Sequence, residues 1–197
     1  MILRNPSHIG LVFCVLALFS CRKAQTEGTK VRPTPEMNVS QEQGKQVFDD
    51  LRLRALKLQP QDLDLKLQGE QTVVYGVVMD WDMPEGVATL VAFSSGDASL
   101  YNSRGGGVIG GVEHANVEKA AKNLVKKAQD YVKKAKQTEA ASLPERNHVG
   151  FYLLTNKGRF YFEENMENFE NQSSSFYSFF EEANKVITEL TIVAGVS

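Results

Sequence analysis

The stretch Tyr75–Glu113, YGVVMDWDMPEGVATLVAFSSGDASLYNSRGGGVIGGVE, contains three short apolar segments, two turn sequences and a run of glycines. Residues 72–80 are nearly all apolar and rich in β-branched side chains, so we expect a central strand covered on both faces. Residues 87–93 and 98–102 are predicted to form the next two strands, because the sequences between the segments are typical of tight turns. Tight turns join antiparallel neighbours, so the stretch predicts an antiparallel sheet.

Three segments with apolar residues at helical spacing surround these strands. They are residues 40–58, with Ser40 as the expected N-cap, residues 114–138, and a C-terminal segment capped by Ser173 or Ser174. Each has one apolar face and one polar face, so each is expected to lie against the sheet rather than inside it.

The segment between the last two predicted helices combines a hairpin pattern with a loop pattern. Residues 148–154 and 159–163 predict two strands joined by a turn at 156–158, and the acidic, Asn-rich residues 164–172 predict a loop. The chain therefore runs through a helix, three strands, a helix, two strands and a helix. This order favours an α+β fold, in which an antiparallel sheet of about five strands has an N-terminal, a central and a C-terminal helix packed on it.

Over residues 40–192 this order of elements is similar to that of the roadblock, longin and profilin group of small domains. The resemblance is topological and includes no sequence motif, so it implies a fold and no activity. Residues 75–111 also resemble segments of uncharacterised bacterial proteins, and this second resemblance implies no function.

Residues 1–21, MILRNPSHIGLVFCVLALFSC, have the layout of a secretory signal peptide. Arg4 precedes an apolar run of about eleven residues, which is too short to span a bilayer as a helix. The last four residues, Leu18–Cys21, resemble a relaxed form of the lipobox of bacterial lipoproteins, with Leu three positions before the Cys and a small residue directly before it. The resemblance implies that residues 1–20 are removed and that the thiol of Cys21 receives a lipid.

The rest of the N-terminal sequence agrees with a protein of the cell envelope. Cys14 leaves with the signal peptide, so the mature chain is expected to have no free thiol, disulfide or cysteine metal site. Residues 21–41 predict a lipidated cysteine and a flexible tether, because Pro, Thr, Gln and charges dominate there, and residues 42–197 predict a single α+β domain. Arg22, rather than Asp, follows the cysteine, and by resemblance to known lipoproteins this favours the outer membrane.

The glycine-rich corner after the third predicted strand matches the pattern G-x-G-x-x-G. Its backbone amides could bind an anion or a nucleotide phosphate at the start of the next helix. The antiparallel context and the lack of an acidic residue at the end of a following strand argue against a dinucleotide site. Two interpretations remain, a close-packed corner or a weak ligand site, for Gly105, Gly106, Gly107, Gly110 and Gly111.

One face of the predicted helix 114–138 is rich in lysine and includes Lys119, Lys122, Lys126 and Lys133. The face is expected either to be solvated or to contact anionic lipid heads or an acidic partner. A net charge of -2 over the whole chain gives no reason to expect nucleic acid as a partner.

No residue of the sequence indicates a metal, a cofactor or a catalytic group. Asp80 and Asp82 offer two carboxylates without further ligands nearby, so we expect exposed acids at the end of a strand. His114 and His148 are the only histidines outside the signal peptide, too few for a zinc site by themselves, and are predicted at a helix start and a strand edge. The G-x-S-x-G turn of many hydrolases is missing from the sequence.

These observations favour a membrane-anchored lipoprotein with a non-catalytic binding or assembly domain. Such a domain is expected to meet its protein partner through an exposed apolar patch of several hundred Å². Two alternatives stay open: a small enzyme or anion-binding domain that uses the glycine-rich corner, and an immunity-type inhibitor.

Overall fold

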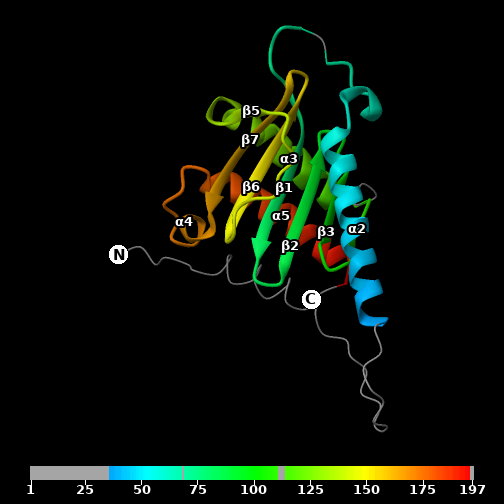
Figure 1. Cartoon of the computed structure of the whole chain (residues 1–197). Helices are drawn as coiled ribbons and strands as arrows, with labels where there is room; N and C mark the ends of the chain where they lie inside the picture. The colour runs from blue at the N-terminus through cyan, green and yellow to red at the C-terminus, as the bar shows by residue number, and fades with distance from the viewer. Residues whose placement is uncertain (1–35, 68, 111–113, 196–197) are drawn as a thin grey trace, which may run out of the picture.

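The computed structural model describes residues 36–67, 69–110 and 114–195, with side chains from residue 42 onward. The predicted signal peptide, Cys21 and most of the predicted tether lie outside these residues. Within them, the chain forms one sheet with helices on both faces (Figure 1).

Seven strands form a sheet in the order β4-β3-β2-β1-β6-β7-β5, and every neighbouring pair is antiparallel. The strands are β1 (Val74–Met83), β2 (Gly86–Phe93), β3 (Ala98–Asn102), β4 (Gly107–Val108), β5 (Lys136–Thr138), β6 (His148–Thr155) and β7 (Gly158–Asn165). The predicted antiparallel sheet and its central strand are confirmed. The sheet has seven strands rather than about five because the short edge strands β4 and β5 extend it.

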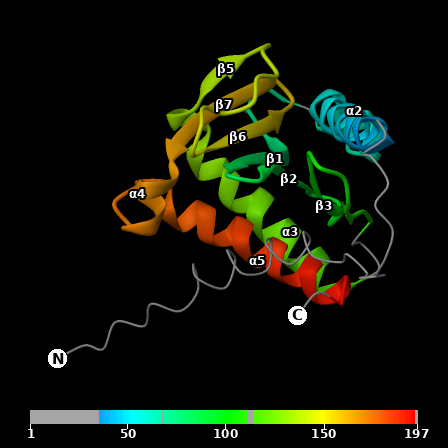
Figure 2. The same ribbon diagram turned by 60° about the horizontal axis from the view of Figure 1, so that its bottom comes forward.

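Three long helices cover the sheet, as predicted. These are α2 (Glu36–Lys57), α3 (Ala115–Ala128) and α5 (Tyr177–Val193). The described chain also contains the short helix α4 (Met166–Glu170) and the 3₁₀ helices η2 (Pro60–Leu63) and η4 (Gln129–Lys134). Figure 2 shows α3 and α5 side by side under one face and α2 alone on the other. The fold is therefore an α+β sandwich with unequal layers on the two faces.

Two of the predicted helix starts differ from the structure. Helix α2 begins at Glu36, inside the segment predicted as tether, so Ser40 lies within the helix and does not cap it. The N-cap of α5 is Phe176 rather than a serine, and the Ser174 hydroxyl instead accepts a hydrogen bond from the Phe176 amide at 3.0 Å.

Two segments form other elements than the sequence predicts. The predicted helix 114–138 ends at Ala128, where the chain tightens into η4 and then enters β5 at the edge of the sheet. Residues 166–170 form α4 rather than a loop, because the Asn165 side chain caps the helix and Phe169 is buried. Both segments are short, and the apolar pattern does not separate an α-helix from a 3₁₀ helix over one or two turns.

The larger core lies between the sheet and the pair α3 and α5. Its centre is aromatic: Phe162 stacks on Phe151 at 4.9 Å and on Phe176 at 4.1 Å between ring centroids. Trp81 meets Phe180 edge to face at 5.6 Å. Such packing makes this layer the main source of hydrophobic stabilisation.

The smaller core lies under α2, where Phe48, Ala55 and Leu56 contact the opposite face of β1 and β2. This layer also contains a buried ion pair. Arg52 of α2 donates to both carboxylate oxygens of Asp80 on β1, with its Nη2 at 2.7 Å from Oδ2. The Asp80 carboxylate accepts a further hydrogen bond from the Thr89 hydroxyl at 2.6 Å.

The prediction that Asp80 is exposed was wrong, because β1 continues to Met83 and places this carboxylate at 0% exposure beneath α2. The same guanidinium donates to the carbonyls of Ala141 and Ser142, at 2.7 and 2.8 Å. Arg52 therefore joins three parts of the chain: α2, the central strand, and the segment that leads into β6.

Candidate functional site

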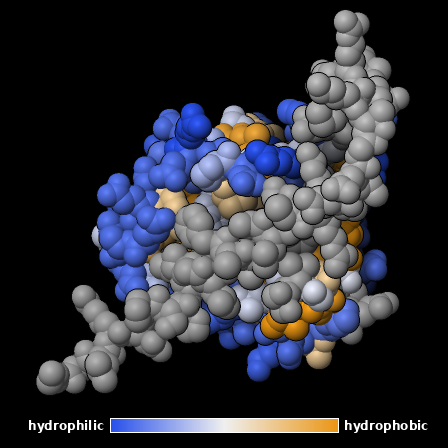
Figure 3. Space-filling view, turned by 90° about the horizontal axis from the view of Figure 1, so that it is seen from below, coloured by the Kyte–Doolittle hydropathy of each residue, from blue (hydrophilic) through white to orange (hydrophobic). Residues whose placement is uncertain are grey.

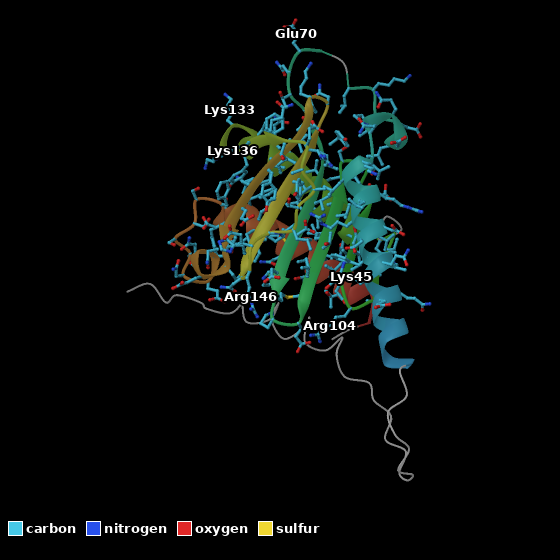
Figure 4. All side chains as sticks on the ribbon, viewed as in Figure 1. Lys45, Glu70, Arg104, Lys133, Lys136 and Arg146 are labelled. Carbon is cyan, nitrogen blue, oxygen red and sulfur yellow. The ribbon has the colours of Figure 1, made fainter. Side chains whose placement is uncertain are left out.

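A groove of about 290 Å³ lies between α2 and the glycine-rich corner. Its lining consists of Gln43, Gly44, Val47, Phe48 and Leu51 from α2, and Tyr101, Asn102, Gly105 and Gly106 from β3 and the corner. Figure 4 marks the place by Lys45 on α2 and Arg104 on the corner, which lie at the same end of the sheet. None of the lining side chains carries a charge, so the groove favours apolar groups.

Glycine at position 44 lets α2 approach the corner closely. A Cβ at this position would lie 3.2 Å from the Arg104 carbonyl oxygen and 3.5 Å from the Gly105 Cα. A glycine inside a helix costs about 0.5–1 kcal/mol relative to alanine, so its presence here is explained by the close approach. The sequence does not reveal this role, because it depends on which turn the helix meets.

The corner itself is a hydrogen-bonded turn. The Arg104 amide donates to Asn102 Oδ1 at 2.9 Å, and the Gly105 amide donates to the Asn102 carbonyl at 3.1 Å. Gly105 and Gly106 both adopt φ +95, a conformation that favours glycine. Since two amides of the turn already have partners within the chain, the corner offers fewer donors to a phosphate than the sequence pattern suggested.

The predicted glycine site does not stay together in the structure. Gly105 and Gly106 line the groove, whereas Gly107 belongs to β4, where a Cβ would lie 2.7 Å from the Tyr101 Cα. Gly110 has open space around its Cα, and Gly111 lies outside the described residues. The edge strand β4 thus separates the corner from α3, so the strand, glycine loop and helix of a dinucleotide fingerprint are not contiguous here.

Tyr101 forms part of the groove wall and was not predicted as a site residue. Its ring meets Phe48 edge to face at 5.9 Å, and only 5% of the residue is exposed. Its hydroxyl has no hydrogen-bond partner among the described residues. Burial raises the pKa of Tyr101 strongly, the charge of Asp80 raises it further, and Arg52 opposes both.

The predicted lysines do not form one uncompensated basic face. Lys119 and Lys126 line a second groove, of about 570 Å³, between α3 and α5, which also holds the acidic residues Asp130, Glu182 and Glu189. Lys122 pairs with Glu118 at 2.5 Å. Lys133 is exposed on η4, far from the end of the sheet marked by Lys45 and Arg104 (Figure 4).

The exposed large hydrophobic residues of the described chain are two residues of α2, Val47 and Leu53, and three residues elsewhere, Ile109, Leu143 and Ile192. Figure 3 shows small apolar areas between hydrophilic ones on the face seen from below. Among these residues, Val47 lines the narrow groove beside α2, which makes this groove the apolar surface to consider as a binding site.

Comparison of the chain with protein-family models, with curated proteins and with solved structures finds no match. No helix within the described residues is long and apolar enough to cross a bilayer. Function is therefore inferred from the groove and from the sequence pattern of the N-terminus.

Replacing Tyr101 with phenylalanine tests the state of the buried hydroxyl. Near pH 7 we expect the free energy of unfolding to stay equal or rise slightly, because the change removes a polar group without a partner. The pKa of Tyr101 is higher in the folded protein than in the unfolded chain. This difference contributes stability that is fully present below about pH 10 and is lost at higher pH, because the unfolded chain then releases the proton first. Urea unfolding of Tyr101→Phe should therefore show a weaker loss of stability above about pH 10 than the wild type. Destabilisation by more than about 1 kcal/mol near pH 7 would show that the hydroxyl has a partner in solution.

Proposed function

We propose that this protein is a membrane-anchored lipoprotein of the cell envelope whose domain binds a protein partner without catalysing a reaction. The groove between α2 and the glycine-rich corner carries the second part of the proposal, because it is apolar, open and uncharged. The lipobox-like Leu18–Cys21 supports the first part. Arg22 after the cysteine favours the outer membrane.

The chain between the anchor and the domain is long enough for this arrangement. Helix α2 begins at Glu36, fifteen positions after Cys21. At about 3.3–3.6 Å per residue, this segment can place the domain up to about 50 Å from the bilayer surface. The groove lies beside α2, the first element after the tether, so a partner near the membrane can reach it.

The size and lining of the groove favour an apolar side chain of a protein partner. A volume of about 290 Å³ lies at the lower end of the range for small-molecule sites. Phe48 and Tyr101 provide aromatic walls, which are typical of pockets that receive an anchor residue from a partner. No cationic side chain lines the groove, so a nucleotide phosphate would find no counter-charge there.

Polar groups lie at the edge of the groove that the glycine-rich corner forms. Gln43 and Asn102 line the groove, and Arg104, between the lining residues Asn102 and Gly105, lies 3.4 Å from Glu85. Val47 lines the groove with 57% of its surface exposed. A partner that covers Val47 would bury an apolar centre beside these polar groups, as in many protein interfaces.

Lipid anchoring predicts that radioactive palmitate labels the chain in growing cells through Cys21. The Cys21→Ser variant should carry no label and should keep its signal peptide when the cells are treated with globomycin or left untreated. The Cys14→Ser variant is the matched control and should be labelled like the wild type, because Cys14 leaves with the signal peptide. Equal labelling of Cys21→Ser and the wild type would contradict lipidation at this position.

Partner binding is tested at two exposed apolar positions of α2. A photo-crosslinking amino acid at position 47 should capture a discrete partner in native envelopes, and the same group at position 53, away from the groove, should not. With the partner identified and purified, Val47→Asp should weaken binding at least about 10-fold, equivalent to about 1.4 kcal/mol, because it places a charge in the apolar groove.

Leu53→Asp is the control for that measurement and should leave affinity unchanged. Both residues are partly exposed on the same helix, at 57% and 38%, so their substitution should affect folding to a similar, small extent. Equal crosslinking at positions 47 and 53, or unchanged affinity of Val47→Asp, would place the binding surface elsewhere.

A further inference from the structure

Three potential metal ligands converge on the α2-side face of the sheet, away from the groove. Glu145 lies before β6, His148 begins β6, and Glu163 lies on β7. One ligand atom from each lies within 4.8 Å of the other two. Figure 4 marks the place by Arg146, at the lower end of β6.

The strand register explains why His148 and Glu163 meet. Glu163 pairs with Gly150, two positions along from His148, so the two side chains are diagonal neighbours on the same face. Gly150 has no side chain to separate them. A Cβ at Gly150 would lie 2.6 Å from the hydroxyl oxygen of Tyr161, so the glycine also lets Tyr161 lean across toward Glu163.

A turn before β6 brings in the third ligand. The His148 amide donates to the Glu145 carbonyl at 3.1 Å, and the Glu145 amide donates to Glu163 Oε1 at 3.3 Å. The Asn147 amide donates to Asp82 Oδ2 at 2.9 Å and ties the turn to β1. Hydrogen bonds to β7 and to β1 therefore hold the backbone that carries Glu145 and His148.

Groups outside the three ligands orient two of them. His148 Nδ1 lies 2.9 Å from the Arg146 carbonyl oxygen, so a proton on Nδ1 leaves Nε2 with its lone pair free to bind a metal. The Tyr161 hydroxyl donates to Glu163 Oε2.

The cluster carries negative charge that no basic side chain neutralises. Among the described residues, none of the ion pairs includes Glu145, Glu163 or the neighbouring Asp82. Arg146 is exposed and belongs to none of these pairs. A cation at the centre of the cluster would supply the missing charge.

We infer that Glu145, His148 and Glu163 form a binding site for a divalent transition metal ion of the zinc class. An imidazole with two carboxylates suits Zn²⁺ or Co²⁺, whereas Ca²⁺ prefers six to eight oxygen ligands. Bonds of about 2.0–2.2 Å to a tetrahedral ion place ligand atoms about 3.3 Å apart, and the exposed side chain of Glu145 can rotate to close the remaining gap. Three protein ligands leave one coordination position for water or for a group of another molecule.

Isothermal titration of Zn²⁺ into the full-length chain, with Cys14 and Cys21 alkylated so that thiols do not compete, measures this site. We expect one ion per chain in the wild type. His148→Ala should bind at least about 100-fold more weakly and Glu163→Gln at least about 10-fold more weakly. His114→Ala removes an exposed histidine outside the cluster and should bind like the wild type.

A second measurement on the unsubstituted chain does not depend on the folding of a variant. Histidine ¹⁵N NMR with and without Zn²⁺ should show a large shift of Nε2 of His148 and no shift for His114. Absence of saturable binding, equal weakening by His114→Ala and His148→Ala, or an unshifted His148 would each overturn the inference. The outcome is independent of the groove beside α2, since the two sites share no residue.

Discussion

The buried ion pair between Arg52 and Asp80 holds the layer on the α2 side of the sheet in place. Asp80 lies inside the central strand with no exposed surface, and a carboxylate at such a position is unstable without a close cation. Burial alone would lower the pKa of Arg52, but the hydrogen bond and charge of Asp80 more than compensate and leave that pKa raised. Helix α2 therefore cannot leave the sheet without breaking the three hydrogen bonds from Arg52 to Asp80.

The same guanidinium links the two sites of this face. On one side, α2 is held against β2 and β3, where Phe48 and Tyr101 meet in the wall of the groove. On the other side, Arg52 holds the carbonyls of Ala141 and Ser142, and so fixes the segment that reaches Glu145. The strand register places Tyr101, Thr89, Asp80, Gly150 and Glu163 in one row across the sheet. Tyr101 of the groove and Glu163 of the acidic cluster thus stand at the two ends of one row of paired residues, with Asp80 at its centre.

Much of the fold could be predicted from the sequence because its signals are local. The β-branched run of β1, the tight turns on either side of β2, and the apolar stripes of α3 and α5 each follow from neighbouring residues. The edge strands β4 and β5 were missed because segments of two or three residues are too short to show the alternation of apolar and polar residues that identifies a strand. The capping side chain of Asn165 was the available signal for α4.

The sites were harder to predict because they depend on long-range register. Arg52 and Asp80 are 28 positions apart, and nothing in either segment indicates that they meet. Gly105 and Gly106 were expected at a ligand site and do line the groove, but its apolar character comes from α2. The acidic cluster could have been found from the predicted hairpin, since pairing its strands brings residues 148–150 opposite 163–165. The number of histidines alone does not reveal the cluster, because Glu145 and Glu163 complete it.

The most direct test is the free energy of unfolding of Arg52→Met, measured by urea denaturation against Arg54→Met, a control at an exposed position of the same helix. If the ion pair holds the α2 layer in place, Arg52→Met loses about 3–5 kcal/mol, because it leaves the Asp80 carboxylate buried without a cation. Adding Asp80→Asn to Arg52→Met then restores part of that loss, while Arg54→Met alone changes stability by less than about 0.5 kcal/mol. An Arg52→Met variant as stable as Arg54→Met would contradict this role of the ion pair.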